Sequence, residues 1–134
     1  MNKSFLKIGA FLGALTVIFG AFAAHAIKSR VSAETLSIFE TGVRYQMYHV
    51  FAIFLVGILS IEIHTKYLIW AGNLFLIGIV LFSGSLYALT YFKANGYDNM
   101  NWLGAITPFG GACFIVGWSL ILLSLYQPKT PVKS

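Results

Sequence analysis

The chain has 134 residues, of which 58% are hydrophobic and only 10% are charged, and its formal net charge is +5. Soluble domains carry about 25% charged residues, so the polar surface here is too small to cover a water-soluble globule. This excludes an ordinary cytosolic enzyme and a disordered chain. The single cysteine, Cys113, excludes a disulfide-stapled secreted module. A mean hydropathy of +0.80 therefore indicates an integral membrane protein.

The charged residues divide the sequence into four long uncharged stretches. A helix needs about 20 apolar residues to cross about 30 Å of hydrocarbon. Continuous apolar runs such as 51–56 lack the alternation of barrel strands, so the predicted fold is all-α, a polytopic membrane four-helix bundle. We expect one integral membrane domain over residues 1–134 with spans at about 8–27, 45–61, 67–92 and 102–126.

The N-terminus resembles a secretory signal, because Lys3 and Lys7 precede an apolar run and Ala24-His25-Ala26 imitates a cleavage site. The run is nearer in length to a full span than to a signal core. We therefore expect the first span to be retained.

A short amphipathic helix is predicted at about 32–43, lying in the membrane interface before the second span. Ser32 is a suitable N-cap, and Glu34 would place a carboxylate in the first turn, where it suits the helix dipole. Gly42 is a natural bend between this helix and the second span. One face of the segment is apolar at helical spacing, formed by Leu36, Phe39, Val43 and Met47.

The basic residues give a weak indication of orientation. Lys3, Lys7, Lys66, Lys129 and Lys133 fall on the side of the termini, against Lys28, Arg30, Arg44 and Lys93 on the other side. The positive-inside rule then favours cytoplasmic termini. The pI of 9.5 fits contact with anionic lipid head groups. No basic run points to nucleic acid, so none is expected as a partner.

Small residues recur along the first span at steps of three and four, at Gly9, Gly13, Thr16, Gly20 and Ala24. Such a stripe lets a second backbone approach closely. It would serve either as a packing seam within the bundle or as the face of a homo-oligomer. The close contacts that a four-helix bundle needs favour the seam.

Polar side chains gather in the half of the membrane near the first and third loops. At about 1.5 Å per residue, Ser85 would lie about 10 Å deep and Thr107 about 8 Å deep. Intramembrane polar groups tend to line sites. Each residue also has a purely structural interpretation, such as snorkelling to phosphates or bonding between helices. The candidate ligand-binding residues are His25, Arg44, Tyr45, Gln46, His49, Ser83, Ser85, Tyr87, Thr107 and Pro108.

Pro108 has two interpretations of its own. A proline inside the fourth span would remove a helix hydrogen bond, and Gly110-Gly111 follows closely. The break would free carbonyl groups for a ligand, or it would only shape packing. The packing interpretation is slightly preferred.

The sequence lacks the residues that several kinds of functional site require. Two histidines on one side of the membrane are too few to predict a metal site. No acidic residue lies within the four spans, so a proton-coupled transporter would lack its carboxylate. Cys113 has no evident activating base. No common hydrolase or nucleotide-binding motif is present. We expect no cofactor and no metal. An enzyme using His25 or His49 as a base ranks last among the functional hypotheses.

Five segments resemble the YgdD/YwdK family of small bacterial membrane proteins, whose members have similar size and four predicted spans. The resemblance implies a multi-pass protein of the bacterial cell membrane but no mechanism, because the family has no established activity. Its motif residues coincide with the polar cluster derived above. The segments are Gly20–Lys28, Thr41–His49, Ser83–Tyr87, Ile106–Gly111 and Gly117-Trp118.

Two functional hypotheses follow. In the first, the polar residues of one leaflet bind or pass a small polar or anionic ligand, or a lipid head group, with Arg44 supplying charge. In the second, the protein is a non-transporting scaffold or complex subunit whose segment 32–43 meets a membrane partner. Membrane lipids are partners in either case.

Overall fold

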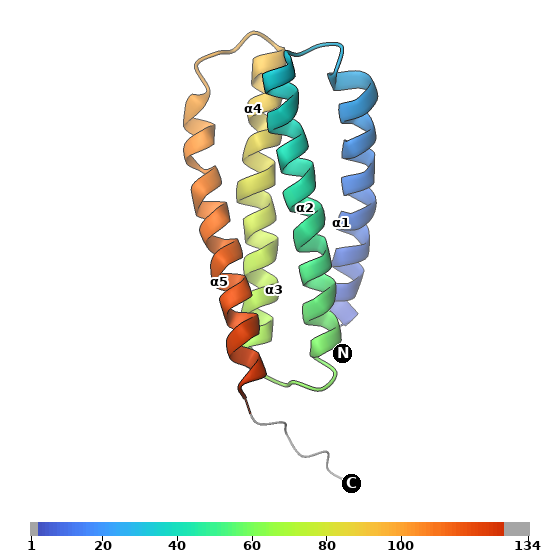
Figure 1. The fold of residues 1–134 in the computed structure, drawn as a ribbon, viewed down its shortest axis with the longest axis vertical. Helices are drawn as coiled ribbons and strands as arrows, with labels where there is room; N and C mark the ends of the chain where they lie inside the picture. Colours follow the sequence, from blue (N-terminus) through green and yellow to red (C-terminus); the bar gives the residue numbers. More distant parts are fainter. Residues whose placement is uncertain (1–2, 128–134) are drawn as a thin grey trace.

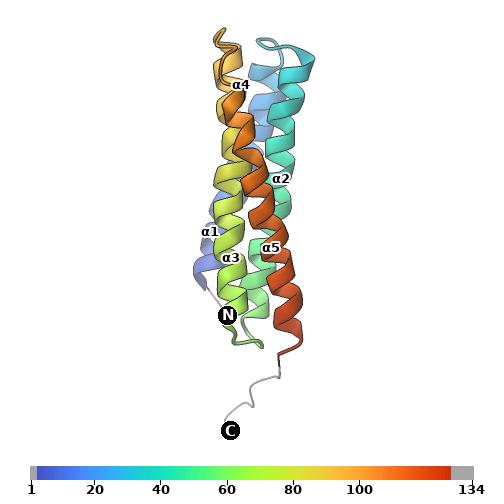
Figure 2. The same ribbon diagram turned by 90° about the vertical axis from the view of Figure 1, so that its left-hand side faces the viewer.

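The computed structural model describes residues 3–127, which form four long helical rods. The first rod is α1 (Lys3–Phe22) with the π-helical turn η1 (Ala23–Ile27), and the second is α2 (Ala33–Leu59). Each rod is long and apolar enough to cross a membrane. The rods run along one axis with sequence neighbours antiparallel, so the start of α1 and the end of α5 lie at the same end (Figures 1 and 2). The predicted all-α four-helix membrane bundle is confirmed.

The third rod is a single span built from three consecutive segments. They are α3 (Lys66–Gly78), the π-helical turn η2 (Ile79–Ser83) and α4 (Gly84–Ala94). The fourth rod begins with the 3-10 turn η3 (Asn101–Ala105) and continues as α5 (Thr107–Leu125). The connection between them contains Gly96, whose φ of 80° suits glycine.

The second rod differs from the prediction at its start. Ser32 caps α2 as expected, its hydroxyl oxygen accepting from the Thr35 backbone N–H at 3.2 Å, and Glu34 lies in the first turn. However, α2 continues unbroken through Gly42 to Leu59, so segment 32–43 is not a separate interfacial helix. Gly42 is buried against Tyr87 and Leu86. The glycine thus permits close packing between helices rather than a bend.

Two rods form the centre of the bundle and two flank it. α2 contacts α1 on one side and α3, η2 and α4 on the other, while α5 packs against α3 and η2. The small-residue stripe of α1 faces α2, since a Cβ at Gly9 would meet Phe54 and one at Gly13 would meet Val50. The preferred interpretation of this stripe, a seam within the bundle, is confirmed.

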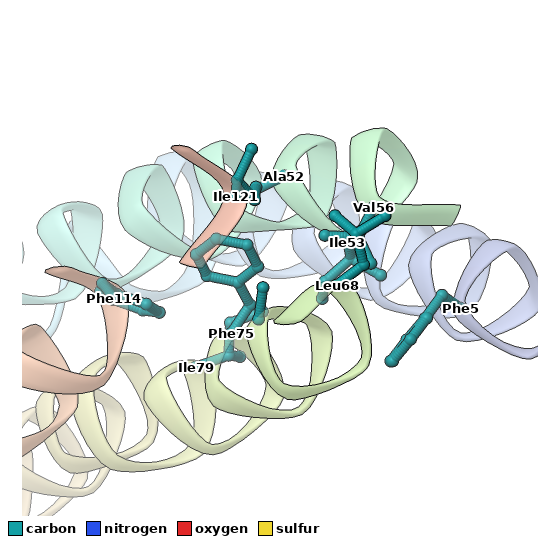
Figure 3. Packing of buried hydrophobic residues seen from close by; sticks show 10 residues of the cluster. Phe5, Ala52, Ile53, Val56, Leu68, Phe75, Ile79, Phe114 and Ile121 are labelled. Carbon is teal, nitrogen blue, oxygen red and sulfur yellow. The ribbon is translucent and has the colours of Figure 1, made fainter. Parts of the chain in front are cut away.

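The apolar core fills the half of the bundle near the α2–α3 connection. Figure 3 shows side chains from α1, α2, α3 and α5 converging there, with Phe75 at the centre of the group. Phe5 of α1 reaches Gly72 of α3 across the bundle. Large apolar side chains on the outer faces of α1 and α5 remain exposed, including Phe11, Val17, Ile115 and Leu122. Such a surface suits contact with lipid chains.

Candidate functional site

The other half of the bundle contains the polar residues that the sequence singles out. Four of them are buried, namely Gln46, His49, Ser83 and Ser85, and Tyr87 and Thr107 are half-buried. His25, Arg44, Tyr45 and Pro108 are exposed. The structure therefore separates the predicted site into an interior group and a surface group.

Gln46 of α2 joins three helices through its amide. Its Nε2 donates to Thr16 Oγ1 of α1 at 2.8 Å, and its Oε1 accepts from the Tyr87 hydroxyl of α4 at 2.9 Å. Thr16 in turn donates to the Leu12 carbonyl oxygen at 2.6 Å. Gln46 is 2% exposed, so both ends of its amide need protein partners. This chain of bonds is complete without a ligand.

His49, one turn further along α2, packs against α5. Its ring lies over the Phe114 ring with 3.4 Å between centroids and 6° between planes. The Trp118 indole N–H donates to His49 Nε2 at 3.3 Å, which makes Nε2 the acceptor. Nδ1 must then donate to the Tyr45 carbonyl oxygen, 2.7 Å away. These bonds assign the neutral Nδ1–H tautomer and use both nitrogens within the protein.

Ser83 and Ser85 attach the third rod to its two neighbours. Ser83 donates to the Gly42 carbonyl oxygen of α2 at 2.7 Å. Ser85 donates to the Phe82 carbonyl oxygen at 2.9 Å and lies 2.8 Å from Thr107 Oγ1, so Thr107 acts as the donor in that pair. The Ser83–Gly42 and Ser85–Thr107 bonds each cross from one rod to another. They join the η2 region to α2 and α5.

The interior group leaves no polar atom waiting for a ligand. Among residues 3–127, every buried side-chain nitrogen or oxygen atom has a hydrogen-bond partner. The interior polar residues thus form three closed sets of bonds, around Gln46, around His49 and around the two serines. This arrangement gives no support for a path by which a solute would pass through this part of the bundle.

Two of the exposed residues lie on different surfaces. Arg44 donates to Thr41 Oγ1 at 3.3 Å and lines a groove of about 360 Å³ between α1, η1 and α2, together with Glu40. His25 lies in η1 and does not line this groove.

Tyr45 and Pro108 have local structural partners. The Tyr45 ring stacks on Phe82 with 4.6 Å between centroids. Pro108 lies in the first turn of α5, just after Thr107, so it begins a helix instead of kinking one. At this position the missing N–H removes no intrahelical hydrogen bond.

A second groove of about 360 Å³ opens between η1, the start of α2 and α4; we call it the Tyr87 groove. Its polar lining comes from Arg30, Tyr87, Thr90 and Asn95. Phe22, Ile27, Val31, Phe39 and Tyr91 contribute apolar lining. Of these residues, only Tyr87 is a site residue predicted from the sequence. Arg30 lies outside the predicted spans, so spacing gives no indication that it approaches α4, and Asn95 directly follows α4 as its C-cap.

A cavity of about 650 Å³ lies at the opposite end of the bundle and was missed at the sequence level. Its basic lining residues are Lys3, His64 and Lys66. The clustering of Lys3, Lys7 and Lys66 on the side of the termini was the available signal. It was read only as an indication of orientation.

Residues 3–127 contain no group of three or more His, Cys, Asp or Glu side chains placed to hold a metal ion.

Comparison with known proteins shows which family the chain is related to. Residues 19–111 match the family described as "Protein of unknown function (DUF423)". The chain is 38% identical to a UPF0382 membrane protein of Staphylococcus haemolyticus over 93% of this chain and 97% of that protein. It is 39% identical to the UPF0382 membrane protein YwdK of Bacillus subtilis over 91% and 95%. A Haemophilus influenzae UPF0382 membrane protein is 36% identical over 97% and 99%. No solved structure matches the chain. The chain thus belongs to this family of small membrane proteins, as its motifs predict.

Proposed function

We propose that this membrane protein binds a lipid in the Tyr87 groove, with the head group near Arg30 and an acyl chain along the apolar lining. The observation that carries the proposal is the composition of the groove. Its polar groups, Arg30 and Asn95, belong to the connections at the end of the bundle, and its aromatic lining extends along α4. A charged rim above an apolar wall is what an amphiphile requires.

The arrangement of helices accounts for the groove. α1 and α4 both pack against α2, and three aromatic rings fill the space where they approach each other. Tyr87 lies 4.9 Å from Phe19 and 4.9 Å from Phe39 between ring centroids. Tyr87 is seven residues before the end of α4, so the floor lies about 10 Å below that end. This depth suits the upper part of an acyl chain.

The groove is connected to the interior. Tyr87 lines the groove with its ring and donates its hydroxyl proton to Gln46. A lipid that displaced the ring would disturb the bond that joins α4 to α2. The interior polar group then acts as a support for the groove and not as a second ligand site.

Location and orientation belong to the same proposal. The relatives are bacterial membrane proteins, which supports placement in the bacterial cell membrane. Cytoplasmic termini, which the basic residues weakly favour, would place the Tyr87 groove in the outer leaflet. The alternative of a scaffold that docks through segment 32–43 gains no support, since Phe39 is buried and Leu36 is half-buried in the bundle.

Native mass spectrometry after release from nanodiscs of phosphatidylglycerol and phosphatidylethanolamine tests the proposal. Ala26 lines the groove, so Ala26→Phe would fill it, and Arg30→Gln would remove its charge. Both variants should retain fewer lipids than the wild type. Ala21→Phe and Lys28→Gln are matched controls, because both residues are exposed and outside the groove. Equal lipid retention by folded Ala26→Phe and wild-type protein would reject the groove as a lipid site.

A further inference from the structure

The larger cavity, at the end of the bundle where α1 starts, has a different chemistry from the Tyr87 groove. It lies between the start of α1, the end of α2 with the connection to α3, and the start of α3. Its volume of about 650 Å³ is sufficient for a polar head group. None of its lining residues belongs to the interior polar group described above.

The lining of this cavity is basic and rich in donors. Lys3 and Lys66 contribute ammonium groups, and His64 contributes an imidazole ring. Thr65 Oγ1 accepts from the Tyr67 backbone N–H at 3.2 Å, and this bond does not use the hydroxyl proton of Thr65. Glu62 belongs to the same connection but is not among the lining residues. The lining therefore attracts an anion.

The surroundings narrow the class of anion. Ile63 and Ile69 also line the cavity, so the charged groups stand beside an apolar wall. The cavity lies at the ends of three spans, which is the level of lipid head groups. Lysine ammonium groups bind phosphate as compact point charges, and hydroxyl groups add hydrogen bonds. A phosphate bearing one or two negative charges fits these groups best.

We propose that this cavity is a phosphate-binding site, occupied by the phosphate of an anionic lipid head group or by free phosphate. Lys3 and Lys66 bind the anion from two different helices, and Thr65 donates from the start of α3. The site is independent of the Tyr87 groove, because it lies at the other end of the spans and shares no residue with it.

Binding to the purified full chain in phosphatidylcholine nanodiscs tests the site. The probes are short-chain phosphatidylglycerol, inorganic phosphate and, as a neutral comparison, additional short-chain phosphatidylcholine. Lys66→Gln and Lys3→Gln should each weaken binding of the anionic probe about tenfold, as expected for loss of one charged hydrogen bond. Binding of phosphatidylglycerol alone would assign the site to a lipid head group, and binding of both anions would assign it to phosphate itself.

Lys7→Gln is the matched control, because it removes the same charge from the same helix one turn away and Lys7 does not line the cavity. It should change the affinity less than twofold. An equal loss in Lys7→Gln and Lys3→Gln would show only general attraction by surface charge and would overturn the proposal. So would an anion affinity no greater than that for phosphatidylcholine. Thermal unfolding without added anion verifies that each variant is folded.

Discussion

At the scale of single residues, the polar side chains inside the spans act as connectors between helices. Gln46 is the clearest case, since one amide joins α2 to both α1 and α4. Hydrogen bonds within a membrane contribute about 0.6 kcal/mol on average and up to about 2 kcal/mol. Removing one member of a buried set also leaves its partners unpaired, which adds to the cost.

Replacing Gln46 should therefore cost more than replacing either partner. Gln46→Leu should lower the free energy of unfolding by about 1–2 kcal/mol, and Tyr87→Phe or Thr16→Val by about 1 kcal/mol or less. Unfolding by SDS titration in mixed micelles measures each value. The double variant Gln46→Leu/Tyr87→Phe should lose less than the sum of the single losses. Full additivity would mean that the 2.9 Å bond contributes nothing.

His49 is expected to stabilise the bundle through ring packing more than through its hydrogen bonds. The ring stacks directly on Phe114, whereas the bond from Trp118 is long at 3.3 Å. His49→Phe should cost less than about 1 kcal/mol, because it keeps a flat ring. His49→Ala should cost about 2–4 kcal/mol through the space that it leaves. The same SDS titration ranks the two variants, and a larger loss for His49→Phe would reverse this assignment.

The sequence placed these polar residues in the correct half of the bundle but could not pair them. Residue type and distance from the charged ends give depth, which is why Ser85 and Thr107 were expected at similar levels. Pairing depends on how far each helix is rotated about its axis. That rotation is not encoded in a span that is apolar on every side.

At the scale of elements, the third rod is the most informative. η2 divides it into α3, which packs against α5 and α2, and α4, which packs against α2 and η3. A π-helical turn contains an additional residue, which the hydrophobic pattern of a fully apolar span does not reveal. Pro108 was misplaced for a related reason. The uncharged stretch predicted several residues of α-helix before Pro108, whereas the 3-10 turn η3 precedes it and α5 begins only at Thr107.

The contact between η2 and α5 depends on the absence of a side chain at Gly110. A Cβ there would meet the backbone nitrogen of Phe82, so Gly110→Ala has to move α5 away from η2. We expect a loss of about 1–3 kcal/mol in unfolding free energy. Gly104→Ala is the control, because a Cβ at Gly104 meets nothing within 4 Å. Similar stability of both variants in the SDS titration would contradict the close approach at Gly110.

At the scale of the whole molecule, four antiparallel rods place alternate connections at opposite ends (Figure 1). The sequence predicted the four spans because charged residues bound each stretch. It could not predict that α2 and the third rod form the centre, since lipid-facing and buried positions have similar composition. Lys129 and Lys133, used for the orientation argument, lie outside the described residues.

The topology predicts a pattern of chemical labelling. In a Cys113→Ser background, cysteines at Ser29 and Asp98 should react with an impermeant maleimide from one side of the membrane. Cysteines at Glu62 and Gln127 should react from the other side. Labelling sealed vesicles of known orientation determines which side is cytoplasmic. Reaction of Ser29→Cys and Asp98→Cys from opposite sides would exclude four spans.

The additional residue in η2 also determines how the third rod would respond to the deletion of one residue. Because a π-helical turn accommodates one residue more than an α-helical turn, deleting one residue from Ile79–Ser83 would let the turn revert to an α-helix with the following segment in nearly its present orientation. Ser85, Tyr87 and Thr90 would then keep their present neighbours. A deletion of one residue from the α-helical turns of Lys66–Gly78 would instead rotate all that follows by about 100°. Among natural variants, we therefore expect the loss of one residue to be tolerated better at η2 than in α3.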